Sequence, residues 1–329
     1  MTFLIQQTFI CTIPLLIVAM AGMFAERSGI INIALDGIMI FGSFGGALTV
    51  YAFIKSGLFT ESPQLIYVIA MIVSAIAGAL FSLLLSFSAI KLKADQTIAG
   101  TAVNMLAPAL VLFVIKIFFM QDKLVMPTLP GGKTLNFAIL NTELPEFLQA
   151  FFSRAYISTY IVLGLYIALS VFLYKTKTGL RLRACGEHPQ AADSVGVSVS
   201  AMRYLGTTIS GALGGLGGFI YITTSAGGTA AGSVAGMGFL AIAIMIFGNW
   251  KPVGIALGSF LFGLLRCIGS AYASIDINGD GVFLLQEIGL PMYFYNIIPY
   301  AAVLIVLMFT AGKSRAPKAE GIPYDKGMR

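Results

Sequence analysis

Long apolar segments alternate with short polar stretches along the whole chain. A helix needs about 20 mainly apolar residues to cross the ~30 Å hydrocarbon core of a bilayer. The pattern therefore predicts an all-α, multi-span membrane protein with about nine transmembrane segments. The predicted segments are residues 3–24, 36–54, 64–90, 98–119, 155–174, 201–223, 235–248, 253–272 and 291–311.

The seventh segment, residues 235–248, is too short to cross the core as one helix. It follows a stretch rich in Gly, Ser and Thr at 225–238. Irregular backbone is tolerated at membrane depth only where it is buried in protein or lines a cavity. We therefore expect a broken membrane element there.

The composition supports the same class, because 58% of the residues are hydrophobic and only 10% are charged. Soluble domains have about 25% charged residues. The spans leave no room for a large soluble domain, so we predict one transmembrane domain over residues 1–329. The three cysteines are widely spaced and predict neither a disulfide framework nor a metal site. Since the first 25 residues contain no Lys or Arg, we expect a retained span rather than a signal peptide.

The basic residues set the orientation. The polar run at 175–204 is the most basic stretch inside the sequence, with Lys175, Lys177, Arg181, Arg183 and Arg203. Basic loops between spans stay on the cytoplasmic side, so 175–200 is predicted to be cytoplasmic. The N-terminus then lies outside, the loop 120–154 is extracytoplasmic, and the tail 312–329 is cytoplasmic along the membrane surface. Fourteen Lys and Arg fall on the inner side and four in outer loops. The net charge of +6 thus reflects topology, and no nucleic acid is expected as a partner.

A short helix is predicted inside the cytoplasmic loop. Pro189 suits a first helical position, residues 190–195 can form about two turns, and Gly196 suits the stop. With the small residues Ala191 and Ala192 on its surface, this helix could dock a soluble partner. The alternative is an ordinary basic loop that only sets the topology.

The span at 201–223 contains small residues on several faces: Ser210, Gly211, Gly214, Gly215, Gly217 and Gly218. Small residues let membrane helices approach closely. We expect tight packing there, with a hinge that moves during transport as the alternative.

Four stretches resemble a known family: AERSGIINIALDGIMIFGSFGGAL (25–48), KLKADQTIAGTAVNML (91–106), GLRLRACGEHPQAADSVGVSV (179–199) and GFLAIAIMIFGNWKPVGIALGSFLFG (238–263). The chain resembles the permease subunit of bacterial ABC importers of the branched-chain amino acid/ribose/nucleoside superfamily. It looks closest to the nucleoside (simple-sugar) subgroup, whose tails are similar to residues 315–327.

The resemblance implies a multi-pass permease in a bacterial cell membrane that imports nucleosides. It implies a separate ABC ATPase that uses ATP and Mg²⁺, a second and different permease chain, and an extracytoplasmic substrate-binding lipoprotein. It also implies that the short helix couples to the ATPase, through Glu187, His188, Pro189, Gln190, Ala191, Ala192, Asp193 and Gly196. The chain has no GxxxxGK[ST] motif, so we expect a transport subunit without enzymatic activity or a resident cofactor.

Two other transport functions stay open. A ribose-like sugar could replace the nucleoside as substrate. A stand-alone secondary transporter could instead use Asp36 as a coupling acid and residues 225–248 as an ion site. A membrane-embedded enzyme is disfavoured, because the only histidine, His188, lies in the cytoplasmic loop.

Polar side chains inside the spans are candidates for the substrate path. Asn32 and Asp36 are four residues apart and share a face if the segment is helical. Asp36 could contact polar substrate groups, or it could be a structural acid that caps the span or pairs with Arg27. The subgroup is expected to have Glu at this position, which leaves the exact role of Asp36 open. Asn104 is a second path candidate, with interhelical hydrogen bonding as the alternative.

Residues 276–287, DINGDGVFLLQE, match the calcium-binding EF-hand loop pattern. The predicted oxygen ligands are Asp276, Asn278, Asp280, the Val282 carbonyl and Glu287, with Gly281 allowing the turn. A structural Ca²⁺ would then hold the outer ends of two spans. The alternative is an ordinary Asp/Asn/Gly turn.

Overall fold

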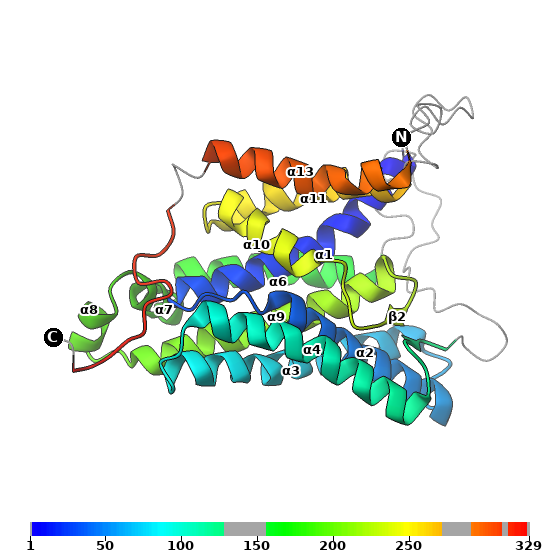
Figure 1. Ribbon diagram of the computed structural model, residues 1–329, viewed down its shortest axis with the longest axis horizontal. Coiled ribbons are helices and arrows are strands. Elements are labelled where there is room, and N and C mark those ends of the chain that lie inside the picture. The colour runs from blue at the N-terminus through cyan, green and yellow to red at the C-terminus, as the bar shows by residue number, and fades with distance from the viewer. Residues whose placement is uncertain (1, 128–155, 272–290, 311–314, 328–329) are drawn as a thin grey trace.

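The computed structural model describes residues 2–127, 156–271, 291–310 and 315–327. Most of these residues are helical, and the long helices lie side by side along the longest dimension of the molecule (Figure 1). The elements are α1 (Thr2–Arg27), α2 (Leu35–Ser56), α3 (Pro63–Ile90), α4 (Gln96–Phe119), β1 (Leu124–Val125), α6 (Ile157–Lys175), α7 (Lys177–Glu187), α8 (Pro189–Ser194), α9 (Val199–Thr224), β2 (Thr229–Ala230), α10 (Met237–Phe247), α11 (Pro252–Ala271) and α13 (Met292–Thr310).

Seven of these helices are long and apolar enough to cross a membrane: α1, α2, α3, α4, α6, α9 and α11. Two shorter apolar helical stretches, Met237–Phe247 and Tyr293–Ile305, fall in the other predicted segments. The structure therefore confirms a mostly helical, multi-span chain. The count of nine crossings remains a prediction.

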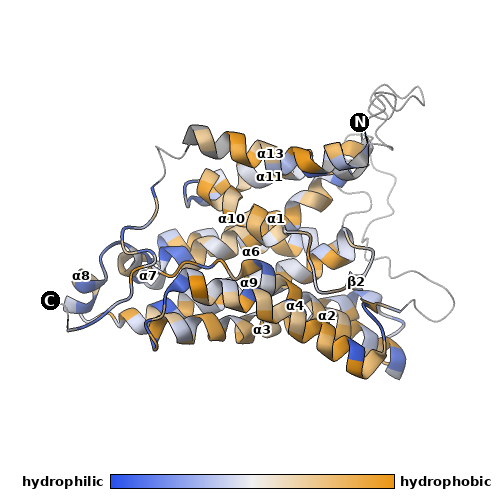
Figure 2. Ribbon diagram, in the orientation of Figure 1, coloured by the Kyte–Doolittle hydropathy of each residue, from blue (hydrophilic) through white to orange (hydrophobic). Residues whose placement is uncertain are grey.

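One end of the bundle carries α7, α8 and residues 315–327, and is called the α8 end below (Figure 1). The N-terminus and β2 lie toward the opposite end. Hydrophobic residues dominate the middle of the long helices, whereas hydrophilic residues gather toward both ends (Figure 2). This distribution is expected if the helix axes run across a bilayer.

Helices α1 and α9 form the centre of the bundle and are the most buried of the long helices. Helix α1 packs against α9, α10 and α11, and α9 also packs against α2 and α3. A helix that is apolar on all sides is suited to such a central position.

The predicted tight packing of α9 is confirmed. A methyl group on Gly215 would collide with the backbone of α3 at Ser74 and Gly78, and one on Gly218 would collide with the Met39 carbonyl of α2. Only residues without a β-carbon allow this approach.

The short helix predicted at residues 235–248 is present as α10, which has 11 residues. The preceding segment turns at Gly227, Gly228 and Gly236, where positive φ values favour glycine. Its strand β2 pairs antiparallel with β1, with Leu124 opposite Ala230. The all-α prediction did not include this two-residue strand pair.

Candidate functional site

The basic stretch after α6 folds into two helices rather than the single short one predicted. Thr176 is the N-cap of α7, and its Oγ1 accepts a hydrogen bond from Gly179 N at 3.1 Å. Helix α7 ends at Glu187, and Pro189 starts α8 as predicted. The chain turns after α8 at Gly196, whose φ of +82° also agrees with the prediction.

Only one of the two alanines of α8 lies on its surface. Ala191 is exposed, together with Gln190. Ala192 is buried, and it packs against Cys185 of α7 and Val199 of α9. The prediction that both alanines lie on the surface is therefore wrong for Ala192, which anchors α8 instead.

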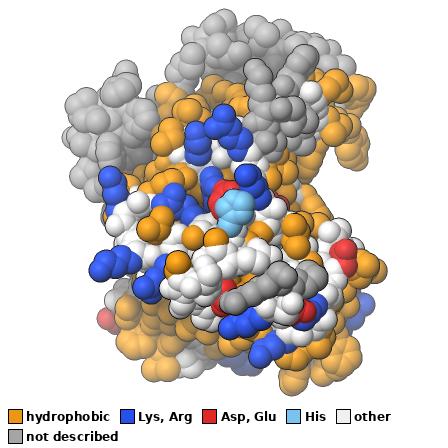
Figure 3. Space-filling model, turned by 90° about the vertical axis from the view of Figure 1, so that its left-hand side faces the viewer, with side chains coloured by type: hydrophobic (Ala, Val, Ile, Leu, Met, Phe, Trp, Pro, Cys, Tyr) orange, Lys and Arg blue, Asp and Glu red, His pale blue; other side chains and the backbone are white. Residues whose placement is uncertain are grey.

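Figure 3 views this end of the molecule and shows Lys and Arg side chains spread over it. Arg203, which the sequence places in the basic run, is not part of this surface. It is buried beside Gly29 and Cys185, with 1% of its surface exposed. The surface around α8 is thus basic and exposes the small residue Ala191.

Glu187, the last residue of α7, connects the junction between α7 and α8 to the membrane helices. Glu187 Oε1 lies 3.5 Å from Nη1 of Arg27, the last residue of α1. Arg27 also donates from Nη2 to the Trp250 carbonyl at 2.9 Å. Arg27 therefore links the junction between α7 and α8 to the turn between α10 and α11.

That turn is fixed by a second contact with α1. Trp250 Nε1 donates to Oε2 of Glu26 at 2.6 Å, and both side chains are buried. Asn249 and Trp250 have positive φ values of 55° and 52°, a conformation that is uncommon outside glycine. The buried hydrogen bond gives this unusual turn a defined position against α1.

The C-terminal residues 315–327 cross the α8 end and are called the strap below. Ala319 N donates to the Gly186 carbonyl at 2.9 Å, and Gly321 N donates to the Gly29 carbonyl at 3.3 Å. An ion pair of 3.4 Å joins Lys326 to Asp193 of α8. The structure places residues 315–327 over α7 and over the residues that follow α1. A course of this tail along the membrane surface stays a prediction.

One side chain of the strap, Glu320, has a pKa above its ordinary value. Burial raises the pKa of Glu320 to about 7, although its hydrogen bond with Glu26 and the charge of Arg27 act in the opposite direction. Glu320 therefore changes charge near neutral pH, at the point where the strap meets α1.

The membrane-depth candidates surround a break between α1 and α2, at residues 28–34. Asn104 bridges this break, because its Nδ2 donates to the Ile33 carbonyl and its Oδ1 accepts from Gly37 N, both at 2.7 Å. Gln96 Oε1 accepts from Ile31 N, also at 2.7 Å. Two polar residues of α4 thus hold the unwound backbone.

Asp36 lies in the first turn of α2, just after the break, and is partly exposed. Its Oδ1 accepts from Gly238 N at 2.9 Å, which satisfies a free amide at the start of α10. Asp36 thus caps a neighbouring helix, whereas the expected alternative partner, Arg27, pairs with Glu187. Asn32 is buried and donates to Ser210 Oγ of α9 at 2.8 Å. Each of the three path candidates has a structural partner, and a substrate contact by any of them stays a prediction.

The predicted calcium ligands Asp276, Asn278, Asp280, Val282 and Glu287 lie outside the described residues, as does most of the loop 120–154. Calcium binding therefore stays a prediction.

Known proteins are similar in sequence to most of this chain. A family described as the permease component of a branched-chain amino acid transport system matches residues 4–309. The chain belongs to this family. The permease is 38% identical to the guanosine ABC transporter permease protein NupQ of Bacillus subtilis, over 100% of this chain and 98% of that protein. It is 36% identical to the nucleoside ABC transporter permease protein NupC of Lactococcus lactis, over 98% and 96%. A second Bacillus subtilis protein, the guanosine ABC transporter permease protein NupP, is 25% identical over 91% and 78%. No solved structure matches the chain.

Membership of the family confirms the resemblance seen in the sequence. The permease is a multi-pass membrane protein and a transport subunit rather than an enzyme. Reasoning from sequence missed several residues that position its parts: Glu26, Gln96, Trp250 and Glu320. Trp250 lies within one of the four stretches that carried the resemblance, but nothing in the sequence indicated that Glu26 is its partner.

Proposed function

We propose that this chain is one transmembrane half of an ATP-driven importer for nucleosides. The observation that carries the proposal is the similarity to NupQ and NupC along essentially the whole chain, since both names specify nucleoside transport. Each relative is also covered almost completely.

The assembly would contain two different permease chains. NupQ and NupP come from the same organism and carry the same substrate in their names. The chain is 38% identical to one and 25% to the other, so we assign it to the NupQ-like position. An ABC ATPase would bind ATP and Mg²⁺ on the cytoplasmic side, and a substrate-binding lipoprotein would deliver nucleoside from outside. Purification of the chain from its host membrane should recover all three partners.

The α8 end would face the cytoplasm, with nine crossings and the N-terminus outside. In this orientation α8 is the coupling helix, with Glu187, His188, Pro189, Gln190, Ala191, Ala192, Asp193 and Gly196 in the segment that meets the ATPase. Movement of α8 would reach α1 and the α10–α11 turn through Glu187, Arg27 and Trp250. Protease protection of the strap in sealed inside-out and right-side-out vesicles tests the orientation.

Uptake of labelled guanosine, with and without the gene, tests the substrate class. Loss of guanosine uptake on deletion is the expected result. If deletion leaves uptake of every nucleoside unchanged but removes uptake of a pentose, the substrate is a sugar and the nucleoside assignment is wrong.

Ala191→Arg tests the coupling role. It places a long cation on the exposed face of α8, so we expect loss of both uptake and ATPase co-purification, with unchanged amounts of chain in the membrane. Ala191→Ser keeps the residue small, and Leu92→Arg adds the same charge at an exposed site in the α3–α4 turn. Both controls should keep uptake. Normal uptake by Ala191→Arg would contradict the coupling role and favour a transporter that needs no ATPase.

The polar residues at the break would contact the nucleoside once the path opens. Asp36, Asn104 and Asn32 offer hydrogen-bonding groups suited to ribose hydroxyls. In the same uptake assay, Asp36→Asn should change the order in which unlabelled nucleosides compete. A purely structural role would lower uptake of all nucleosides equally.

A further inference from the structure

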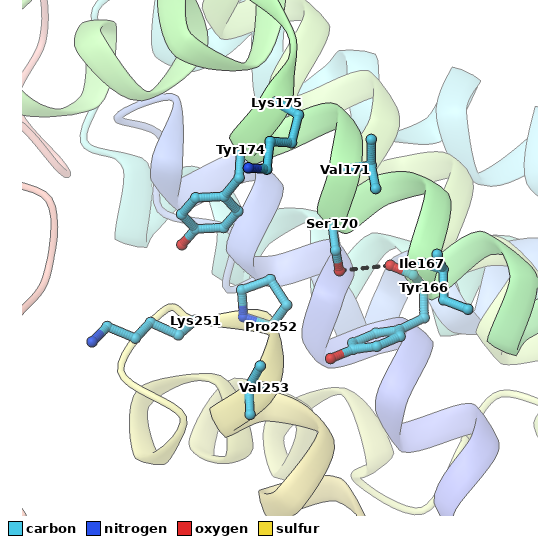
Figure 4. Close-up of a pocket in the computed structure, with 9 residues that line it drawn as sticks. All are labelled: Tyr166, Ile167, Ser170, Val171, Tyr174, Lys175, Lys251, Pro252 and Val253. Atoms are coloured by element: carbon cyan, nitrogen blue, oxygen red, sulfur yellow. Dashed lines mark hydrogen bonds between the residues drawn. The ribbon is translucent and has the colours of Figure 1, made fainter.

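An open groove of about 490 Å³ lies on the outside of the bundle, between α6 and the start of α11 (Figure 4). Its walls are mainly apolar, with Ile167 and Val171 from α6 and Pro252 and Val253 from α11. Ile167, Val171 and Val253 are more than half exposed. The groove therefore opens on the outward face of the helices, and its volume is in the range of about 300–1,000 Å³ that holds small molecules.

Positive charge is concentrated at one end of the groove. Lys175, the last residue of α6, and Lys251, just before α11, both line it and are exposed. Neither lysine side chain forms an ion pair or a hydrogen bond with another described residue. None of the described residues that line the groove is acidic.

An aromatic side chain with a third cation lies beside these lysines. The guanidinium of Arg183 lies 4.7 Å from the centre of the Tyr174 ring, and its Nε donates to the Leu173 carbonyl at 3.1 Å. Figure 4 shows Tyr174, Lys175 and Lys251 toward one end of the groove, with Tyr166 and Ile167 toward the other. Tyrosine and lysine at the end of a span mark the level of the lipid headgroups.

We propose that this groove binds an anionic glycerophospholipid of the cytoplasmic leaflet. One acyl chain lies along Ile167 and Val171, and the headgroup phosphate lies between Lys175 and Lys251. Basic pockets between membrane helices are suited to anionic headgroups, and an apolar channel that ends in two free ammonium groups matches such a lipid along its length. The proposal depends on the cytoplasmic placement of the α8 end, and not on the substrate or the ATPase.

The bound lipid would connect the segment that precedes α8 with the turn between α10 and α11. Lys175 is followed directly by Thr176 and α7, and Lys251 follows Trp250, whose carbonyl accepts from Arg27. One phosphate that holds both lysines would therefore tie α6 and α7 to the α10–α11 turn.

Native mass spectrometry of the purified full-length complex tests the proposal, with phosphatidylglycerol and phosphatidylcholine as probes. We expect retention of phosphatidylglycerol in preference to phosphatidylcholine. Lys175→Gln with Lys251→Gln should weaken phosphatidylglycerol binding about 30-fold, about fivefold for each lysine near an anionic headgroup. The matched control, Lys91→Gln with Lys318→Gln, removes two exposed charges at the same end but outside the groove and should leave binding unchanged.

Val171→Trp is an independent test, because it fills the groove at an exposed site without removing charge. It should reduce retention of phosphatidylglycerol while the thermal stability in detergent stays the same. Unchanged lipid retention in both groove variants would overturn the proposal. If the groove variants instead release the second permease and leave lipid retention unchanged, the groove is a protein interface and the proposal is also wrong. Neither readout requires nucleoside transport.

Discussion

The core between α2, α3 and α9 and the α8 end are held together by different kinds of contact. In the core, backbones touch at glycines: Gly42 lies against Gly215, and Gly78 lies against Gly211 and Gly215. At the α8 end, charged and polar side chains join segments that are far apart in sequence, as Glu26 joins Trp250.

The difference matters for a transporter, because dispersion contacts fall off within a fraction of an ångström. Sliding α9 against α3 would lose many of them together. The polar contacts of the α8 end are few, and those nearer its surface, such as Glu187 with Arg27, can be exchanged for water or for a partner protein. We infer that α2, α3 and α9 move as one body, while the α8 end can rearrange around them.

The largest effect is expected for Gly215→Leu. The leucine side chain would meet the Ser74 carbonyl and Gly78 of α3. Both of these obstacles are helix backbone, which cannot move aside. Overpacking of this kind costs about 3 kcal/mol or more. The yield of monodisperse protein in detergent should collapse. Gly164→Leu is the matched control, because a β-carbon on Gly164 of α6 meets no atom within 4 Å; equal yields for the two variants would contradict the glycine-packed core.

Trp250→Phe should have a smaller but clear effect. The change keeps the aromatic bulk but removes the N–H that donates to buried Glu26. A buried acceptor that loses its partner costs about 1–3 kcal/mol. The melting temperature of the purified protein should fall, and Tyr293→Phe, at a residue that is 79% exposed, should leave it unchanged. A melting temperature of Trp250→Phe equal to that of the parent would show that this hydrogen bond does not hold the turn.

The comparison also explains what the sequence could predict. Hydropathy located the segments that become α1, α9 and the other long helices, because burial in lipid leaves a strong pattern over about 20 residues. The Gly211–Gly218 cluster predicted close packing, since small residues let membrane helices approach each other closely. Pro189 and Gly196 bounded α8 through local turn chemistry.

Contacts between distant segments could not be predicted in this way. Nothing local indicates that Trp250 meets Glu26, or that Asp36 caps α10. The same holds for Ala192: six residues of helix do not reveal which face α7 and α9 will cover. Membrane-depth roles for Asn32 and Asn104 also depend on partners that only the fold brings near, Ser210 and the break before α2.

The strap should loosen as pH rises. The folded-state pKa of Glu320 is about 7, above its ordinary value of 4.5, so docking favours the protonated form. The stabilisation is complete below about pH 4.5 and is lost as pH rises through 7. Opening of the strap should increase up to about tenfold between pH 6 and pH 8. Hydrogen exchange at Ala319 and Gly321, corrected for its intrinsic pH dependence, measures this change.

Glu320→Gln is the control for that experiment, because it removes the titrating group and keeps the shape. Strap opening in this variant should be nearly independent of pH. If the tenfold change persists in Glu320→Gln, another group controls the strap.

The smallest effect is expected for the ion pair between Lys326 and Asp193. Lys326 Nζ lies 3.4 Å from Asp193 Oδ1, and the Lys326 side chain is 74% exposed. Water and salt therefore screen the attraction. Such pairs contribute about 0–1 kcal/mol. A double-mutant cycle with Asp193→Asn and Lys326→Gln isolates the interaction, and melting temperatures at low and high salt should differ by only a degree or two. An interaction well above about 1 kcal/mol would mean that one contact dominates the strap. The α8 end would then be fixed by a single strong interaction, and its proposed ability to rearrange contact by contact around the glycine-packed core would be wrong.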